Sequence, residues 1–290
     1  MKFSNYNTFS ADFLNKGLDE AIKHTVDLGI GYVEHIEIIN KGVYKIGSIE
    51  EARTMRKKLD DNGLGVSCYS VVANLCGEDG DHYLDELYRH IEYAAIIGSP
   101  FIHHTLTAGF MPDTVKLTTL EALDLAKDRA EKAAKRCNEY GMTCLYEPQG
   151  FYFNGVEGVE AIINEMRSRG CKVGVCGDTG NSIYFDCMPT EIFRAFKDDI
   201  LHIHVKDRRY GLDETSKMLT REGKTVNSAR LGEGNIGVIE ALSIVPEYDG
   251  ILSLEFDDTD EEIKRTKLIL YPAFALVAAL VIIAIWLLGK

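Results

Sequence analysis

The stretch MTCLYEPQGFYFNGVEGVEAIINEMRSRGCKVGVCGDTGNS, residues 142–182, contains the repeating unit from which the fold can be inferred. It begins with a short β-rich run, Thr143–Tyr146, and continues into an amphipathic helical pattern, Val156–Arg169. A second β-rich run, Lys172–Cys176, follows directly. A strand, a helix and a second strand in this order and at this spacing are typical of a parallel βαβ unit.

The same alternation continues on both sides of this stretch. The other predicted strands are Lys2–Thr8, Tyr32–Ile38, Gly65–Val71, Phe101–Thr105, Ile200–Val205 and Ile251–Phe256. The other predicted helices are Leu18–Leu28, Ser48–Asn62, Tyr83–Ile97, Leu117–Tyr140, Pro189–Lys197, Gly237–Val245 and Asp260–Leu270. Eight strand–helix repeats without a linker predict an α/β fold, a (β/α)8 TIM barrel over residues 1–267.

An open doubly wound sheet is the alternative architecture. No GxGxxG motif follows the first strand, so the sequence gives no support to a dinucleotide site. One interruption of the repeat stands out, a long polar insertion from Arg208 to Arg230 after the seventh strand. Loops of this length near the mouth of a barrel can form a lid.

The last apolar run, LILYPAFALVAALVIIAIWLLG at residues 268–289, contains no charged residue. As a helix it would span roughly 33 Å, enough for the hydrocarbon core of a bilayer. Lys264, Arg265 and Lys267 precede it, which favours a cytoplasmic location for the barrel. We therefore predict a C-terminal transmembrane anchor and a membrane localisation with the catalytic domain in the cytoplasm. The alternative is a buried last helix of a soluble domain.

The overall composition excludes several classes of protein. Acidic residues outnumber basic ones 45 to 32, and the resulting formal charge of −13 repels phosphate backbones, so nucleic acid is not an expected partner. The seven cysteines form no CxxC pair, which disfavours a disulfide framework or a zinc knuckle and suits a reducing compartment. The N-terminus has neither the basic nor the apolar region of a signal peptide.

Chemically competent side chains stand at the C-terminal ends of four predicted strands, where barrel active sites form. Glu147 and Asp178 follow the fifth and sixth strands, His204 lies on the seventh, and Glu255 lies on the eighth. Three carboxylates and one imidazole suit a hard divalent cation, and without one the close carboxylates would repel each other. We expect Mn²⁺ first, with Mg²⁺ or Co²⁺ as alternatives.

Several segments together resemble a known family. LYEPQG (145–150), VCGDTGNS (175–182), LHIHVKDR (201–208), LGEGNIG (231–237) and LSLEFDD (252–258) are similar to the xylose-isomerase-like TIM barrel superfamily, and closest to its sugar phosphate isomerase/epimerase branch. That branch includes ketose 3-epimerases and inosose dehydratases. In LGIGYVEHIEI (28–38), Glu34 matches a recurrent glutamate of the family's second strand.

The resemblance implies a function and a set of roles. Glu147, Asp178, His204 and Glu255 would hold a divalent metal, and the two glutamates would also act as catalytic acid and base on opposite faces of the substrate. The expected activity is isomerisation or epimerisation of a small sugar or polyol ketone through an enediolate. The alternatives are an inosose-type dehydratase and a non-catalytic, membrane-tethered barrel. An abasic-site endonuclease shares the barrel, but the negative charge disfavours it. A homo-oligomer is compatible with either enzyme.

Four further residues are candidates for substrate binding. Asn181 stands where the family pattern DTGH often has a histidine, so it keeps a hydrogen-bond donor but not a titratable group. Lys206 and Arg208 follow the histidine ligand and could hold a substrate oxygen or phosphate, or could instead be exposed or paired with a carboxylate. His104 on the fourth strand could reach the pocket, although His103 competes for that role.

Overall fold

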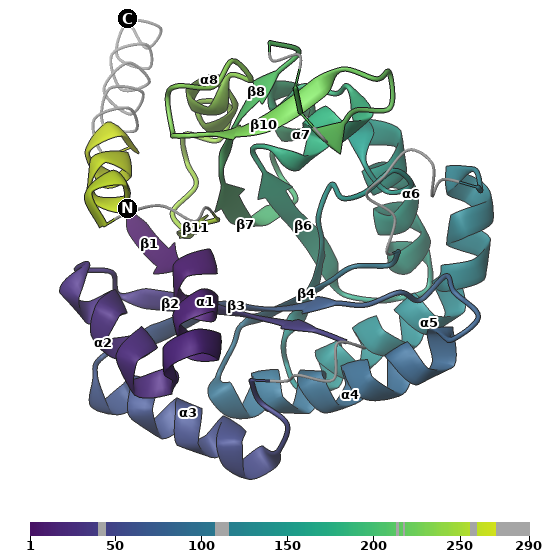
Figure 1. Cartoon of the computed structure of the whole chain (residues 1–290). Coiled ribbons are helices and arrows are strands. Elements are labelled where there is room, and N and C mark those ends of the chain that lie inside the picture. The colour runs from purple at the N-terminus through teal and green to yellow at the C-terminus, as the bar shows by residue number, and fades with distance from the viewer. Residues whose placement is uncertain (40–44, 108–115, 213–214, 217, 256–259, 271–290) are drawn as a thin grey trace, which may run out of the picture.

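Eight parallel strands close into a barrel that is surrounded by helices (Figure 1). The structure, a computed structural model, describes residues 1–39, 45–107, 116–212, 215–216, 218–255 and 260–270. Around the barrel the strands follow the order β1-β11-β7-β6-β5-β4-β3-β2. The strands are β1 (Lys2–Asn5), β2 (Tyr32–Ile38), β3 (Gly65–Val72), β4 (Phe101–His104), β5 (Thr143–Tyr146), β6 (Val173–Asp178), β7 (Ile200–Val205) and β11 (Ile251–Leu254). The predicted (β/α)8 barrel is confirmed.

Helices cover the outer surface of the barrel. They are α1 (Asn7–Lys16), α2 (Leu18–Asp27), α3 (Ile49–Asp61), α4 (Gly80–Ile97), α5 (Thr119–Glu139), α6 (Gly155–Ser168), α7 (Pro189–Phe196) and α8 (Val238–Leu242), with a short 3-10 helix η2 (Asn181–Phe185). The start of α3 agrees with the sequence pattern, because Ser48 Oγ accepts a hydrogen bond from Glu51 N–H at 3.2 Å. The core lies between the strands and the inner faces of these helices.

The chain between β1 and α2 differs from the prediction. The predicted strand Lys2–Thr8 ends at Asn5, and α1 follows it. Asn5 Oδ1 accepts a hydrogen bond from Phe9 N–H at 3.1 Å, so a side chain of the strand satisfies one of the free N–H groups of the helix. Gly17, with φ of 93°, then separates α1 from α2.

The predicted polar insertion after the seventh strand forms a small sheet instead of an irregular loop. Strands β8 (Asp207–Tyr210), β10 (Thr225–Ala229) and β9 (Met218–Leu219) pair in that order, and both pairings are antiparallel. The pairing of Asp207 with Ala229 and of Tyr210 with Val226 places this sheet directly after β7. Figure 1 shows that it lies at one end of the barrel.

The described C-terminal segment, residues 260–270, is helical and lies beside the turn between α2 and β2. Lys267 Nζ donates hydrogen bonds to the carbonyl oxygens of Leu28 and Gly29 at 3.1 and 3.0 Å. No helix among the described residues is both long and apolar enough to cross a membrane. Apart from its first three residues, the predicted transmembrane anchor at 268–289 lies outside the described residues.

Candidate active site

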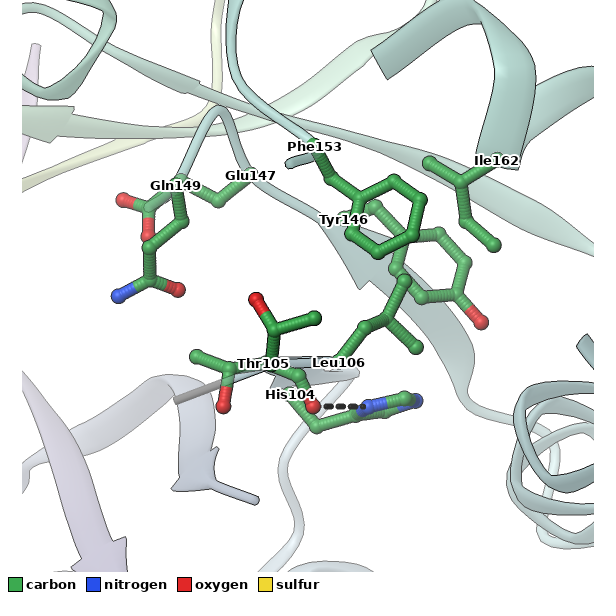
Figure 2. Close-up of a pocket in the computed structure, with 9 residues that line it drawn as sticks. His104, Thr105, Leu106, Tyr146, Glu147, Gln149, Phe153 and Ile162 are labelled. Atoms are coloured by element: carbon green, nitrogen blue, oxygen red, sulfur yellow. Dashed lines mark hydrogen bonds between the residues drawn. The ribbon is translucent and has the colours of Figure 1, made fainter. Parts of the chain in front are cut away.

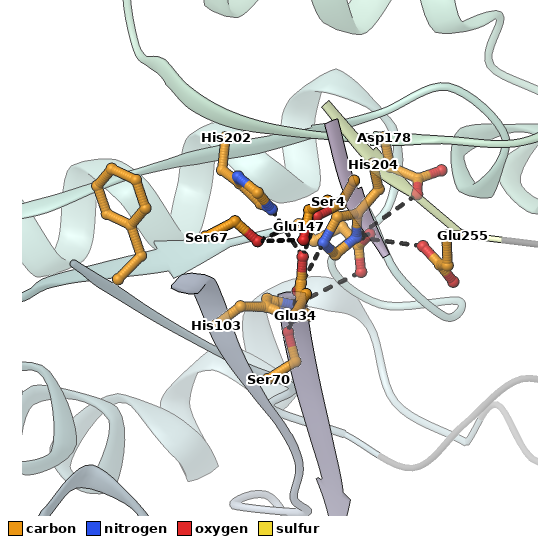
Figure 3. Close-up of polar contacts among 12 residues, drawn as sticks. Ser4, Glu34, Ser67, Ser70, His103, Glu147, Asp178, His202, His204 and Glu255 are labelled. Atoms are coloured by element: carbon orange, nitrogen blue, oxygen red, sulfur yellow. Dashed lines mark hydrogen bonds and ion pairs between the residues drawn. The ribbon is translucent and has the colours of Figure 1, made fainter. Parts of the chain in front are cut away.

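The four predicted metal ligands lie together at the C-terminal ends of four neighbouring strands (Figure 3). Glu147 follows β5, Asp178 ends β6, His204 belongs to β7 and Glu255 follows β11. One potential ligand atom from each residue lies within 4.8 Å of the corresponding atom of every other. The fold therefore brings together residues that are separated by up to 108 positions in the sequence, from 147 to 255.

His204 stands at the centre of this cluster. Its Nδ1 lies 2.7 Å from Glu147 Oε1, 3.2 Å from Glu255 Oε2 and 4.0 Å from Asp178 Oδ2. The side chains of His204, Glu147 and Asp178 are buried, whereas that of Glu255 is 20% exposed. Glu255 is thus the member of the cluster whose side chain is partly accessible to solvent.

The ammonium group of Lys206 lies among the same carboxylates. Its Nζ is 3.0 Å from Asp178 Oδ2 and 2.7 Å from Glu255 Oε1, and its side chain is only 3% exposed. Burial acts to lower the pKa of Lys206, but the two carboxylates outweigh burial and raise it above the usual range for lysine. The predicted substrate-binding lysine is therefore charged and directed into the cluster.

The surroundings shift the pKa values of the two glutamates in opposite directions. Burial raises the pKa of Glu147 to about 8, with a contribution from Asp178 and against the opposing charge of His204. Burial also acts to raise the pKa of Glu255, but Lys206 and His204 hold it well below its usual range. Two carboxyl groups whose pKa values are driven apart in this way can serve as an acid and a base.

The cluster fits a divalent cation. Asp178 Oδ2 and Glu255 Oε2 are buried and lie close to Lys206 Nζ and His204 Nδ1, at 3.0 and 3.2 Å, but neither contact has the geometry of a hydrogen bond. Buried carboxylate oxygens are normally satisfied by well-formed hydrogen bonds, so both oxygens keep capacity for a positive ligand. Three carboxylates and an imidazole are ligands of the kind that hard divalent cations accept.

Asn181 lies next to the cluster, whereas the side chain of Arg208 is held by the small sheet. The backbone N–H of Asn181 donates to Asp178 Oδ1 at 2.5 Å, and Gly180 N–H donates to the same oxygen at 2.7 Å. The main chain of Asn181 therefore helps to position the carboxylate of Asp178. Arg208 belongs to the small sheet, where its Nη1 donates to Ser228 Oγ at 2.6 Å.

The adjacent histidines of β4 occupy different surroundings. His103 Nε2 lies 3.5 Å from Glu147 Oε2, so His103 is the histidine in contact with the cluster. His104 packs edge-on against Tyr146, with the ring centroids 5.3 Å apart, and burial lowers its pKa to about 4. It lines a small cavity of about 20 Å³ that Glu147 and Gln149 also line (Figure 2).

Three residues near the site were not among the predicted functional residues. Glu34 on β2 and His202 on β7 are buried and form a hydrogen bond of 2.8 Å beneath the four ligands. The ring of Tyr6, which follows β1, lies 4.9 Å from that of His204. The only signal for Glu34 was its match to a recurrent family glutamate. His202 and Tyr6 gave none, because the sequence does not reveal which side chains point into a barrel.

Comparison with known proteins agrees with this architecture. A family model described as xylose isomerase-like TIM barrel matches residues 22–270. No curated protein matches the chain significantly.

Solved structures with the same fold are numerous. An L-ribulose 3-epimerase has a TM-score of 0.74 at 16% identity, with 98% of each chain covered. A probable 3-DHS dehydratase, AsbF from Bacillus anthracis, has a TM-score of 0.69 at 15% identity, covering 93% of this chain and 99% of the other. A xylose isomerase-like TIM barrel protein from Mycobacterium smegmatis in complex with magnesium has a TM-score of 0.68 at 16% identity, covering 89% of this chain and 88% of the other. At these identities the likeness establishes the fold.

Proposed function

The chain belongs to the xylose isomerase-like TIM barrel family, and from that premise we propose that it is a divalent-metal-dependent isomerase or epimerase of a small sugar or polyol ketone. The observation that carries the proposal is the convergence of Glu147, Asp178, His204 and Glu255 at one end of the barrel. The neighbours named as L-ribulose 3-epimerase and D-tagatose 3-epimerase-like protein support the same reaction class.

These four residues would hold the cation, for which Mn²⁺ is our first choice and Mg²⁺ or Co²⁺ the alternatives. When bound, the cation would supply positive charge that stabilises the negative charge of an enediolate. Asp178 is suited to a purely structural part, because its other oxygen already accepts two backbone hydrogen bonds. Glu147 and Glu255 remain for proton transfer.

The reaction moves a proton on a carbon next to a carbonyl group. One glutamate removes the proton as a carboxylate, and the other returns a proton as a carboxylic acid. Return to the opposite face of the same carbon gives epimerisation, and return to the neighbouring carbon gives isomerisation. The divergent pKa values of Glu147 and Glu255 in the metal-free protein are consistent with such a pair.

The remaining candidates would orient the substrate. Lys206 would donate to a substrate oxygen, since its ammonium group already lies between two of the ligands. Arg208 and Asn181 would contact the substrate from the side of the small sheet and η2. His104 would contribute from the cavity that it shares with Glu147.

A dehydratase of the inosose type is the second candidate. It begins with the same proton removal, but the enolate then expels a hydroxyl group from the next carbon. The similarity in fold to a probable 3-DHS dehydratase supports the dehydratase as the alternative. A non-catalytic barrel is disfavoured, because a scaffold would not need three carboxylates, an imidazole and an ammonium group gathered at one end of the barrel.

Product analysis tests the proposal. The full chain is incubated with Mn²⁺ and a panel of ketoses, aldoses and inososes, and the products are identified by carbon NMR. We expect conversion of one substrate class, inhibition by EDTA, and a loss of about 10²- to 10⁴-fold in Glu147→Gln and Glu255→Gln. Glu160→Gln, on the exposed face of α6, is the matched control. Conversion that is unaffected by EDTA would contradict metal dependence, and water loss would establish the dehydratase.

Two further proposals concern the surroundings of the enzyme. We propose that residues 268–289 attach the chain to a membrane, on the basis of their apolar sequence, with the barrel in the cytoplasm, on the basis of the basic residues that precede them. A homo-oligomer remains an expectation from the resemblance.

A further inference from the structure

Glu34 is a carboxylate enclosed in the barrel directly beneath the four ligands (Figure 3). Four groups lie within hydrogen-bond distance of its two oxygens. Oε1 is 2.7 Å from Ser70 Oγ and 3.0 Å from His204 Nε2, and Oε2 is 2.8 Å from His202 Nε2 and 2.5 Å from Ser253 Oγ. An ionised carboxylate can only accept hydrogen bonds, and four acceptances fill its capacity. The directions of these hydrogen bonds are therefore fixed.

The first consequence concerns His204. Because Glu34 Oε1 accepts, His204 Nε2 must carry a proton and donate it. Burial acts to lower the pKa of His204, but neighbouring groups, Glu34 and Glu147 among them, raise it well above its usual value, so the metal-free ring also carries a proton at Nδ1. A ring that binds a cation releases the Nδ1 proton and presents the Nδ1 lone pair, while Nε2–H still donates to Glu34. Nδ1 is the atom that lies 2.7 Å from Glu147 Oε1 and 3.2 Å from Glu255 Oε2. Glu34 thus directs the free lone pair of His204 toward the other ligands.

The second consequence concerns His103 and passes through Ser70. The single hydroxyl proton of Ser70 is donated to Glu34 Oε1. Ser70 Oγ lies 3.2 Å from His103 Nδ1 and can only accept there, so Nδ1 carries the proton of that ring. His103 Nε2 then has the lone pair, and it faces Glu147 Oε2 at 3.5 Å without a hydrogen-bond partner among the described residues.

We propose that Glu34 is a positioning residue that fixes the tautomers of both imidazoles at the site. It presents His204 Nδ1 to the cation and, through Ser70, presents His103 Nε2 beside Glu147 as an acceptor for a hydroxyl group of the substrate. The cation part rests on the proposed function, whereas the hydrogen bonds of Glu34 and the tautomer of His103 belong to the protein itself. A carboxylate that accepts from the second nitrogen of a metal-binding histidine orients the ring and strengthens it as a ligand.

Glu34, His202 and His204 also form a group that could hold a cation of its own. The distances of 2.8 and 3.0 Å from the carboxylate to the two imidazole nitrogens are those of direct hydrogen bonds. A cation between these atoms would have to displace donors that already satisfy the carboxylate. The arrangement is therefore explained by a hydrogen-bond network and not by a second metal centre.

The test combines two measurements on the full chain. Nitrogen-15 NMR of histidine-labelled protein, metal-free and with Mg²⁺, reports which ring nitrogens are protonated, and calorimetric titration gives the affinity for Mn²⁺. The variants are Glu34→Gln, which removes the charge, and Ser70→Ala, which breaks only the branch to His103. Ser67→Ala is the matched control, because its hydroxyl donates to Ser4 Oγ at 2.7 Å and not to Glu34.

We expect His204 to be protonated at Nε2 and His103 at Nδ1 in the wild-type protein. Glu34→Gln should change both tautomer populations and weaken Mn²⁺ binding about 10- to 100-fold. Ser70→Ala should change only His103 and leave Mn²⁺ affinity within about twofold, and Ser67→Ala should change neither.

Three results would overturn the proposal. They are a wild-type spectrum with the opposite tautomer of either ring, unchanged Mn²⁺ affinity in Glu34→Gln, and equal loss of affinity in Ser70→Ala. The wild-type spectrum decides the tautomers even if Glu34→Gln fails to fold. A wild-type protein that binds neither Mn²⁺, Mg²⁺ nor Co²⁺ would instead overturn the proposed function and the cation part of this inference, while the spectrum still tests the role of Glu34.

Discussion

The ammonium group of Lys206 lies 2.7 Å from Glu255 Oε1 and also contacts Asp178, so a side chain places a positive charge where three carboxylates meet. In the metal-free protein this charge offsets repulsion that would otherwise raise the energy of the folded state. A bound divalent cation would supply positive charge to the same carboxylates. Lys206 and the cation should therefore partly substitute for each other in stabilising the protein.

Replacing this lysine tests that substitution. We expect Lys206→Met to lower the free energy of unfolding in EDTA by about 3 kcal/mol, because removing one partner of a buried ion pair leaves the other uncompensated. Saturating Mn²⁺ should then stabilise the variant by more than it stabilises the wild type. Urea unfolding with and without Mn²⁺ measures both quantities. Lys172→Met, at an exposed position, is the control, and an equal Mn²⁺ effect in both proteins would refute the idea.

The raised pKa of Glu147 predicts a pH dependence of stability in EDTA. The folded-state pKa is about 8 and the reference value is 4.5, so between these pH values the folded protein holds a proton that the unfolded chain has released. The free energy of unfolding should therefore fall as the pH rises through this window, by up to about 1.4 kcal/mol per pH unit. Thermal unfolding from pH 5 to pH 8 measures the slope.

Glu147→Gln should remove this contribution to the slope, because an amide does not titrate. Glu160→Gln, on an exposed helix face, should keep the wild-type slope. In the wild type, Mn²⁺ should stabilise more at pH 8 than at pH 6, since the cation competes with the proton for the carboxylate. A Glu147→Gln slope identical to that of the wild type would show that this carboxyl group titrates normally.

Membrane attachment is testable without truncating the chain. Leu280→Arg combined with Ile283→Arg places two charges in the middle of the apolar run 268–289. At the centre of a spanning helix each costs about 2.5–3.5 kcal/mol, so the double variant should be released by alkaline carbonate while the wild type stays with the membranes. Leu120→Arg, at an exposed position of α5, is the control. Release of the wild-type chain would exclude the anchor.

Much of the barrel could be predicted from the sequence because each strand is buried on both faces. Their β-branched, aromatic and other apolar residues mark them in the sequence, and Tyr32–Ile38, Thr143–Tyr146 and Ile200–Val205 begin and end at the predicted residues. The four ligands could be identified for a related reason. The C-terminal ends of barrel strands meet at one mouth, so the polar residue at each end can be read without knowing the register.

The network around Glu34 could not be predicted in this way. Its partners Ser70, His202 and Ser253 lie 36, 168 and 219 residues away in the sequence. Burial on both faces hides which side chains of β2 point into the barrel, and the pairing of β2 with β3 shifts register between Val33 and Glu34. The shift leaves Ser67 of β3 as an extra residue, which changes the direction of the following side chains of β3 relative to β2, and it is visible only in the folded structure.

Enediolate chemistry at this site is tested by solvent exchange. The full chain with Mn²⁺ is mixed with ketoses, aldoses and inososes in deuterated water, and proton NMR follows the hydrogens on carbons next to the carbonyl group. We expect that one substrate exchanges such a hydrogen, that EDTA stops the exchange, and that Glu147→Gln abolishes the exchange. Absence of exchange across the whole panel, in a protein that binds no divalent cation, would contradict it.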